Sequence, residues 1–251
     1  KCESLVTVLI PPSVKLIEES AFTRCSSLTA ISIPSSVTKI KSNTFSGCYL
    51  LKNVSIPSSV TSIGSTAFYK CESLVNILIP SSVEYIGEKA FSLCYSLETF
   101  SIPSSVTTIQ ELTFELCFQL KSITIPSSVT CIKKSAFENC KSLENISIPS
   151  SVTDIKDSAF RKCESLENIS IPSSVTNIGE SVFLECSSLA HVSISSLLNT
   201  DNLGFNPQVL VDTFWNHKHT LSILIKWILI YNSSFYFIRN VDELAKYFKN
   251  F

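Results

Sequence analysis

The stretch C-E-S-L-V-N-I-L-I-P-S-S-V-E-Y-I-G-E-K-A-F-S-L, residues 71–93, decides the fold because it recurs in one register along most of the chain. The period is 23 residues, and it is clearest at two positions. Cysteine stands at 2, 25, 48, 71, 94, 117, 140, 163 and 186, and phenylalanine stands at 22, 45, 68, 91, 114, 137, 160 and 183. A fixed period of this length is the signature of a repeat array, in which each unit packs against its neighbours.

The first half of each unit has the alternation of a β-strand. In residues 71–93 this predicts that Ile77 and Ile79 face the core and that Asn76 and Leu78 face outward. Pro80 follows directly, and we expect it to end the strand because proline fixes φ and lacks an N–H.

The second half of each unit predicts a return segment. Residues 88–91 are expected to form a single helical turn that is stable only because Phe91 is buried. Since stacked strands lie about 4.8 Å apart, the recurring phenylalanines should form one continuous buried spine. The short turns and helical turns would then cover the side opposite the strands.

The motif L-x-x-[IV]-x-I-P, followed by S-S-V-x-x-I and A-F-x-x-C, resembles the BspA-like leucine-rich repeat family, TpLRR subclass. The resemblance covers residues 1–198, as eight full repeats plus a partial one. It implies an α/β right-handed leucine-rich repeat solenoid. A parallel β-sheet would line one face, with short turns and single helical turns on the other.

The repeat pattern ends where Ser195 stands in place of the expected proline. Residues 199–251 are predicted to form a non-repeat C-terminal cap or small extra domain that covers the open end of the core. The apolar run 221–238 is interpreted as two strands around a turn at 232–234. A membrane-associated span is the alternative, and it is not favoured because Lys226 and the polar residues 232–234 interrupt the run.

The composition limits the classes of function. The formal net charge is −1 at pH 7, so nothing in the charge favours nucleic acid or an anionic membrane surface as a partner. No nucleophile motif, phosphate-binding loop or paired carboxylates are present, so we expect no catalytic residues and no cofactor. The chain opens at Lys1 inside a repeat, which is typical of a piece of a longer protein.

The cysteines are expected to be buried free thiols, because nine of them share one repeat position. Disulfides between neighbouring units are the alternative, since stacked Cα atoms about 5 Å apart are within disulfide range. Cys131 stands at a variable position and is expected to be an exposed, incidental surface thiol. The less favoured alternative is a reactive thiol whose pKa is lowered by Lys133 and Lys134. No metal site is expected, because His217 and His219 lack further ligands at suitable spacing.

The outward residues of the strands form the candidate binding surface. They are small, polar and almost uncharged, and the position after each cysteine adds aromatic residues of a kind enriched in recognition surfaces. The alternative is that these residues only keep the sheet soluble. The candidate ligand-binding residues are Asn53, Ser55, Asn76, Leu78, Tyr95, Thr99, Ser101, Phe118, Ser122, Thr124, Asn145 and Ser147.

The resemblance implies a non-enzymatic surface or secreted adhesin that binds proteins or glycans. An intracellular, cytoplasmic protein-interaction scaffold is the first alternative, because a reducing compartment keeps thiols free. A structural or ice-ordering solenoid ranks lower, since the outward rows mix Asn, Ser, Leu and Thr.

Overall fold

The computed structural model describes residues 2–194, 203–204 and 210–211. The chain divides into two compact units, Lys1–Thr213 and Phe214–Phe251, and the fold below is that of the first. The predicted cap and the run 221–238 lie outside the described residues, apart from the few positions just named. Among the residues described, no helix is long and apolar enough to cross a membrane.

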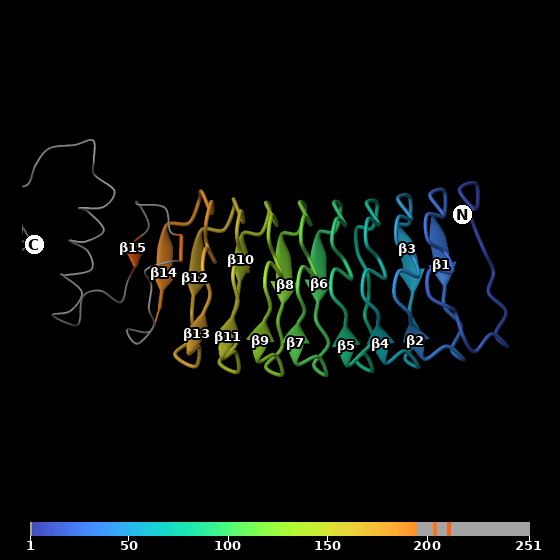
Figure 1. The fold of residues 1–251 in the computed structure, drawn as a ribbon, viewed down its shortest axis with the longest axis horizontal. Coiled ribbons are helices and arrows are strands. Elements are labelled where there is room, and N and C mark those ends of the chain that lie inside the picture. Colours follow the sequence, from blue (N-terminus) through green and yellow to red (C-terminus); the bar gives the residue numbers. More distant parts are fainter. Residues whose placement is uncertain (1, 195–202, 205–209, 212–251) are drawn as a thin grey trace, which may run out of the picture. The chain divides into compact units, whose positions relative to one another are not determined.

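The first unit is a parallel-strand solenoid in which successive coils stack side by side (Figure 1). The strand predicted from sequence forms two parallel ladders on the side that we call the strand face. One ladder consists of β1 (Ala30–Ser32) and β3 (Asn53–Ser55). The other consists of β6 (Thr99–Ser101), β8 (Ser122–Thr124), β10 (Asn145–Ile146), β12 (Asn168–Ser170), β14 (His191–Ser193) and β15 (Leu210–Val211).

Another parallel ladder lies where only short turns were predicted, and we call it the second face. Its two-residue strands are β2 (Lys39–Ile40), β4 (Ser62–Ile63), β5 (Tyr85–Ile86), β7 (Thr108–Ile109), β9 (Cys131–Ile132), β11 (Asp154–Ile155) and β13 (Asn177–Ile178). In each of these strands the second residue is an isoleucine, which is buried in all of them except β13, where Ile178 is half-buried. The second face therefore closes the core from another side.

Pairing between neighbouring coils follows the sequence period. Thr99 pairs with Ser122, and Lys39 pairs with Ser62, each 23 residues further along. His191 pairs with Leu210 through a shorter coil, so the ladder continues past residue 198. The domain boundary at 198 stays a prediction, because residues 195–202 lie outside the described part.

The core confirms the predicted alternation. Ile77 and Ile79 are buried, whereas Leu78 between them is 83% exposed. The phenylalanine spine also forms as predicted, with Phe45, Phe68 and their counterparts stacked in parallel at centroid distances of 5.3–5.8 Å. Each ring therefore contacts the ring of the coil before it and the coil after it.

The predicted helical turn at 88–91 is wrong, and with it the α/β class, because no described residue is in a helix. Lys89 and Leu93 have positive φ angles of 54° and 63°, which a right-handed helix does not accept. The backbone N–H of Phe91 instead donates to the carbonyl of Thr113 in the next coil, at 3.0 Å. Bonds between coils thus alternate with turn bonds within the coil, such as the one from the N–H of Ala90 to the carbonyl of Gly87 at 3.2 Å.

A serine fixes the corner after each proline. The Oγ atom of Ser128 donates to the carbonyl of Val106 in the preceding coil at 2.7 Å. The same bond recurs from Ser36 to Ser174. The second serine of the I-P-S-S-V motif is therefore explained by a bond between coils, since an unpaired buried carbonyl would be costly.

Candidate functional site

The strand face carries the predicted binding residues on one continuous surface. Ten of the twelve are exposed, and Tyr95 and Phe118 are half-buried. The ladder register sets Thr99 beside Ser122 and Ser101 beside Thr124. The structure therefore brings the predicted residues together as two polar rows that run from coil to coil.

Contacts within the rows are local. Thr99 donates a hydrogen bond from Oγ1 to Oδ1 of Asn76, at 3.0 Å. Asn145 pairs with Ser122 in the ladder, so amide and hydroxyl groups lie next to each other in the row. Such groups both donate and accept hydrogen bonds, which suits recognition of a polar or peptide surface.

An aromatic edge borders these rows. The rings of Tyr95 and Phe118 stack with centroids 5.0 Å apart and planes 4° apart. The ammonium of Lys141 lies 5.8 Å from the Phe118 centroid and forms an ion pair with Glu164 at 2.9 Å. We call Tyr95, Phe118 and Lys141 the aromatic edge.

Lys141 and Glu164 were not among the predicted residues. The signal that could have found them is their sequence position, directly after the repeat cysteine, where Tyr95 and Phe118 also stand. A residue at that position contacts the same position in the next coil.

An apolar spot interrupts the polar rows in the fourth repeat. Leu78 is 83% exposed and Val75 is 38% exposed, whereas Ser55 and Ser101 occupy the Leu78 position in the flanking coils. Leu78 therefore adds exposed apolar area to a row that is small and polar in the flanking coils.

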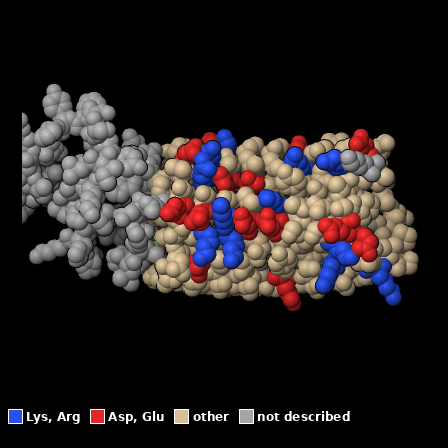
Figure 2. All heavy atoms as spheres, in the orientation of Figure 1, with Lys and Arg blue, Asp and Glu red and all other residues tan. Residues whose placement is uncertain are grey.

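Charged residues occur as mixed pairs. Figure 2 shows lysine and arginine side chains next to acidic ones on the face in view. Arg161 contacts Glu138 at 3.3 Å and Glu185 at 3.1 Å, and Lys121 contacts Glu98 at 3.3 Å. Each pair is partly exposed and so contributes at most about 1 kcal/mol to stability.

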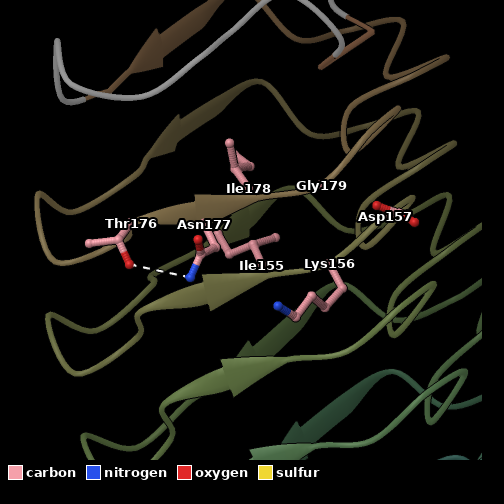
Figure 3. Close-up of a pocket in the computed structure, with 7 residues that line it drawn as sticks. All are labelled: Ile155, Lys156, Asp157, Thr176, Asn177, Ile178 and Gly179. Carbon is pink, nitrogen blue, oxygen red and sulfur yellow. Dashed lines mark hydrogen bonds between the residues drawn. The ribbon is translucent and has the colours of Figure 1, made fainter.

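A shallow depression on the second face is the other candidate site (Figure 3). It is lined by Ile155, Lys156, Asp157, Thr176, Asn177, Ile178 and Gly179. At its rim, Lys156 donates to Asp154 at 2.7 Å, and this hydrogen bond lowers the pKa of Asp154 and raises the pKa of Lys156. Asn177 also donates to Asp154, at 3.1 Å. The carboxylate of Asp154 thus already accepts hydrogen bonds from Lys156 and Asn177. The residues that line the depression do not pair a nucleophile with a neighbouring base.

All ten cysteines are free, which confirms the prediction of free thiols. Those from Cys25 to Cys186 at the repeat position are buried, and Cys2 is exposed. Burial raises the pKa of Cys94 and Cys186 to about 12, so these thiols stay protonated at neutral pH.

Cys131 differs from its prediction. It is half-buried in β9, and burial raises the pKa of its thiol, an effect larger than the lowering by Lys133. The alternative of a thiol activated by lysine is therefore wrong, and the expected exposure of Cys131 is only partial.

Metal ligands are not clustered in the part of the chain that the structure describes, where no group of three or more His, Cys, Asp or Glu side chains could hold an ion. His217 and His219 lie outside that part.

A known protein family matches the repeat region of the chain. The family model "BspA type Leucine rich repeat region" matches residues 1–121 and 109–206, in six copies. Comparison with curated proteins finds no match.

Two solved structures are similar to the chain. A leucine-rich repeat protein from Bacteroides ovatus is 40% identical with a TM-score of 0.71, and the match covers 80% of this chain and 50% of that one. The T. pallidum leucine rich repeat protein TpLRR is 32% identical with a TM-score of 0.54, over 68% of this chain and 69% of that one. This chain thus spans half the length of the first of these proteins. With the family model matching most of the chain, the protein belongs to the BspA-type leucine-rich repeat family.

Proposed function

We propose that the protein is a non-enzymatic binding module that recognises another protein through its strand face. The observation that carries this proposal is the continuous exposed surface of paired polar rows, with the aromatic edge on one side and Leu78 within it. A rigid scaffold that presents aromatic and apolar groups inside a polar surround has the composition of a protein interface. A glycan is the alternative ligand, since stacked aromatic residues and hydroxyls also suit sugars.

We further propose that the protein acts at the cell surface or in the secreted space, as an adhesin. Membership of the BspA-type family supports this location. A long array of small polar side chains would let an extended partner contact several coils at once, so affinity would build up over many weak contacts.

The test is binding to a panel of purified extracellular-matrix proteins, measured by biolayer interferometry. Two matched double variants test whether the partner binds the strand face or the second face. Thr99→Lys with Thr124→Lys adds charge to the strand face, and Thr130→Lys with Thr153→Lys adds the same charge to exposed positions beside the second-face ladder.

The strand-face variant should weaken binding at least roughly tenfold, because two unpaired charges at an interface cost more than about 1.4 kcal/mol. The second-face variant should bind as the wild type does. Equal loss in both variants, or no binding to any protein in the panel, would contradict the proposal.

An intracellular scaffold is the second candidate, and one observation favours it. Every cysteine is free, as expected in a reducing compartment. Fractionation of the native cells, with thiol labelling before and after denaturation, separates the candidates. Recovery in the soluble cytosol would overturn the adhesin proposal and favour the scaffold.

A further inference from the structure

The second-face ladder is interrupted at one place, between the fourth repeat (residues 71–93) and the fifth (residues 94–116). On the second face, β5 and β7 are not paired, although every other neighbouring pair from β2 to β13 is. On the strand face, residues 76–78 separate β3 from β6 and belong to neither sheet. In Figure 1, β5 and β7 stand visibly farther apart than β4 and β5.

The next junction, between the fifth and sixth repeats, shows the regular backbone hydrogen bonds of the second face. The N–H of Thr130 donates to the carbonyl of Thr107 at 2.9 Å. The N–H of Lys133 donates to the carbonyl of Ile109, also at 2.9 Å. The same two bonds join the third repeat to the fourth.

At the interrupted junction both bonds are missing. The N–H of Thr107 makes no bond to the carbonyl of Glu84, and the N–H of Gln110 makes none to the carbonyl of Ile86, although the structure describes all four residues. Two backbone donors and two acceptors therefore lack, at this junction, the partners that the equivalent groups have at the next one.

The physical cause is Phe100. It fills the inward strand position, and its ring meets Phe91 and Phe114 edge-on at centroid distances of 4.9 and 4.7 Å. All other units have a β-branched residue there: Val8, Ile31, Val54, Ile77, Ile123, Ile146, Ile169 and Val192. A larger side chain in a close-packed core forces its surroundings apart.

Hydrogen bonds still join the fourth and fifth repeats next to the stacked rings of Phe91 and Phe114. Phe91 donates its N–H to Thr113 at 3.0 Å, and the Cys117 thiol donates to the Phe91 carbonyl at 3.2 Å. Ser105 still donates to Val83 at the corner after the strand. On the strand face, the N–H of Glu98 donates to the carbonyl of Val75 at 3.0 Å, and Thr99 donates to Asn76 at 3.0 Å. Hydrogen bonds therefore join the two repeats around the Phe91–Phe114 stack and along the strand face, whereas the second-face ladder is open.

We propose that this junction is a flexible joint, in which the first four repeats and the repeats from the fifth onward move as two blocks about the Phe91–Phe114 stack. Phe100 is the wedge that keeps the second-face ladder open. Movement at the joint changes the curvature of the strand face next to Leu78. The proposal holds whatever the protein binds.

Distances between spin-label pairs test the joint. The pair Thr61→Cys and Thr130→Cys spans the junction, and the pair Thr107→Cys and Thr176→Cys lies wholly within the second block. All four threonines are exposed and share one repeat position, and each pair is separated by three repeats. Both pairs are placed in a Cys2→Ser, Cys131→Ser background, because the remaining cysteines are buried.

The distance distribution across the junction should be roughly twofold broader than the distribution within the block, as expected for a hinge between rigid parts. Phe100→Ile, the residue of most other units, should narrow the first distribution to the width of the second. Equal widths in the wild-type background overturn the joint. A broad distribution that persists in Phe100→Ile overturns the role of Phe100 as the wedge.

Hydrogen exchange gives a check that needs no substitution. The amides of Thr107 and Gln110 should exchange at least roughly tenfold faster than those of Thr130 and Lys133, which are bonded to the preceding coil. Equal protection of the two pairs would show that the ladder is closed in solution and would overturn the proposal.

Discussion

The thiol of Cys117 donates a hydrogen bond to the carbonyl oxygen of Phe91, 3.2 Å away in the fourth repeat. The same carbonyl accepts the backbone N–H of Cys94 at 3.3 Å. The thiol bond recurs from Cys48 to Cys186. This explains why the position is cysteine, which is small and apolar enough for the core and still supplies a donor.

Replacing that thiol should destabilise the solenoid. Cys117→Ala removes both the donor and the packed sulfur of a fully buried side chain, so the free energy of unfolding should fall by about 1–3 kcal/mol. Chemical denaturation followed by circular dichroism measures the loss. Cys131→Ala is the control, and its half-buried side chain should cost less than about 1 kcal/mol. An equal loss in both variants would contradict the role of the thiol bond.

The buried thiols should also make stability depend on alkaline pH. Burial raises the pKa of Cys94 to about 12 from an ordinary value of 9.0, so the folded protein holds a proton that the unfolded chain releases. The stabilisation is complete below pH 9.0 and is lost as the pH rises from there toward 12.

Thermal unfolding at a series of pH values should therefore show a Tm that decreases above about pH 9. In Cys94→Ala the decrease should be shallower, because one such thiol is gone. Cys2→Ala, which removes an exposed thiol, should keep the wild-type slope. A slope that is the same in all three proteins would mean that other groups cause the decrease.

Two phenylalanine variants separate stability from binding. Phe137 is fully buried between Phe114 and Phe160, so Phe137→Ala should lower the free energy of unfolding by about 3–5 kcal/mol. Phe118→Ala truncates a half-buried ring of the aromatic edge and should cost about 1 kcal/mol. In the binding assay above, Phe118→Ala should weaken binding. Unchanged affinity in this variant would place the aromatic edge outside the interface.

The left-handed residues offer a test of backbone strain. Ser158 has a φ of 56°, and its N–H donates to the carbonyl of Glu180 at 2.9 Å. Because a Cβ atom is unfavourable at this φ, Ser158→Gly should be more stable than Ser158→Ala by about 1 kcal/mol.

The same pair of variants at Ser150 is the control. Ser150 does not have a positive φ, so there the alanine variant should be the more stable one. Urea denaturation of the four variants measures both differences. If the glycine variant were the more stable one at both sites, the left-handed backbone at Ser158 would not be the cause of its greater stability.

Most of the buried positions could be predicted from the sequence alone. The 23-residue period and the strand alternation predicted the inward Ile77 and Ile79, the outward Leu78, the phenylalanine spine and the free buried cysteines. These predictions succeed because burial is a property of one position, and an array repeats each position in the same surroundings. The binding role of the strand face stays a prediction.

Only the tertiary structure decided how the coils bond to one another. The helical turn predicted at 88–91 does not form, because Lys89 and Leu93 adopt a left-handed backbone that bonds between coils stabilise. The second-face ladder and its interruption beside Phe100 likewise depend on pairs of coils. Hydrogen bonds between coils are set by the relative position of two backbones, which local propensity and hydrophobic pattern do not encode.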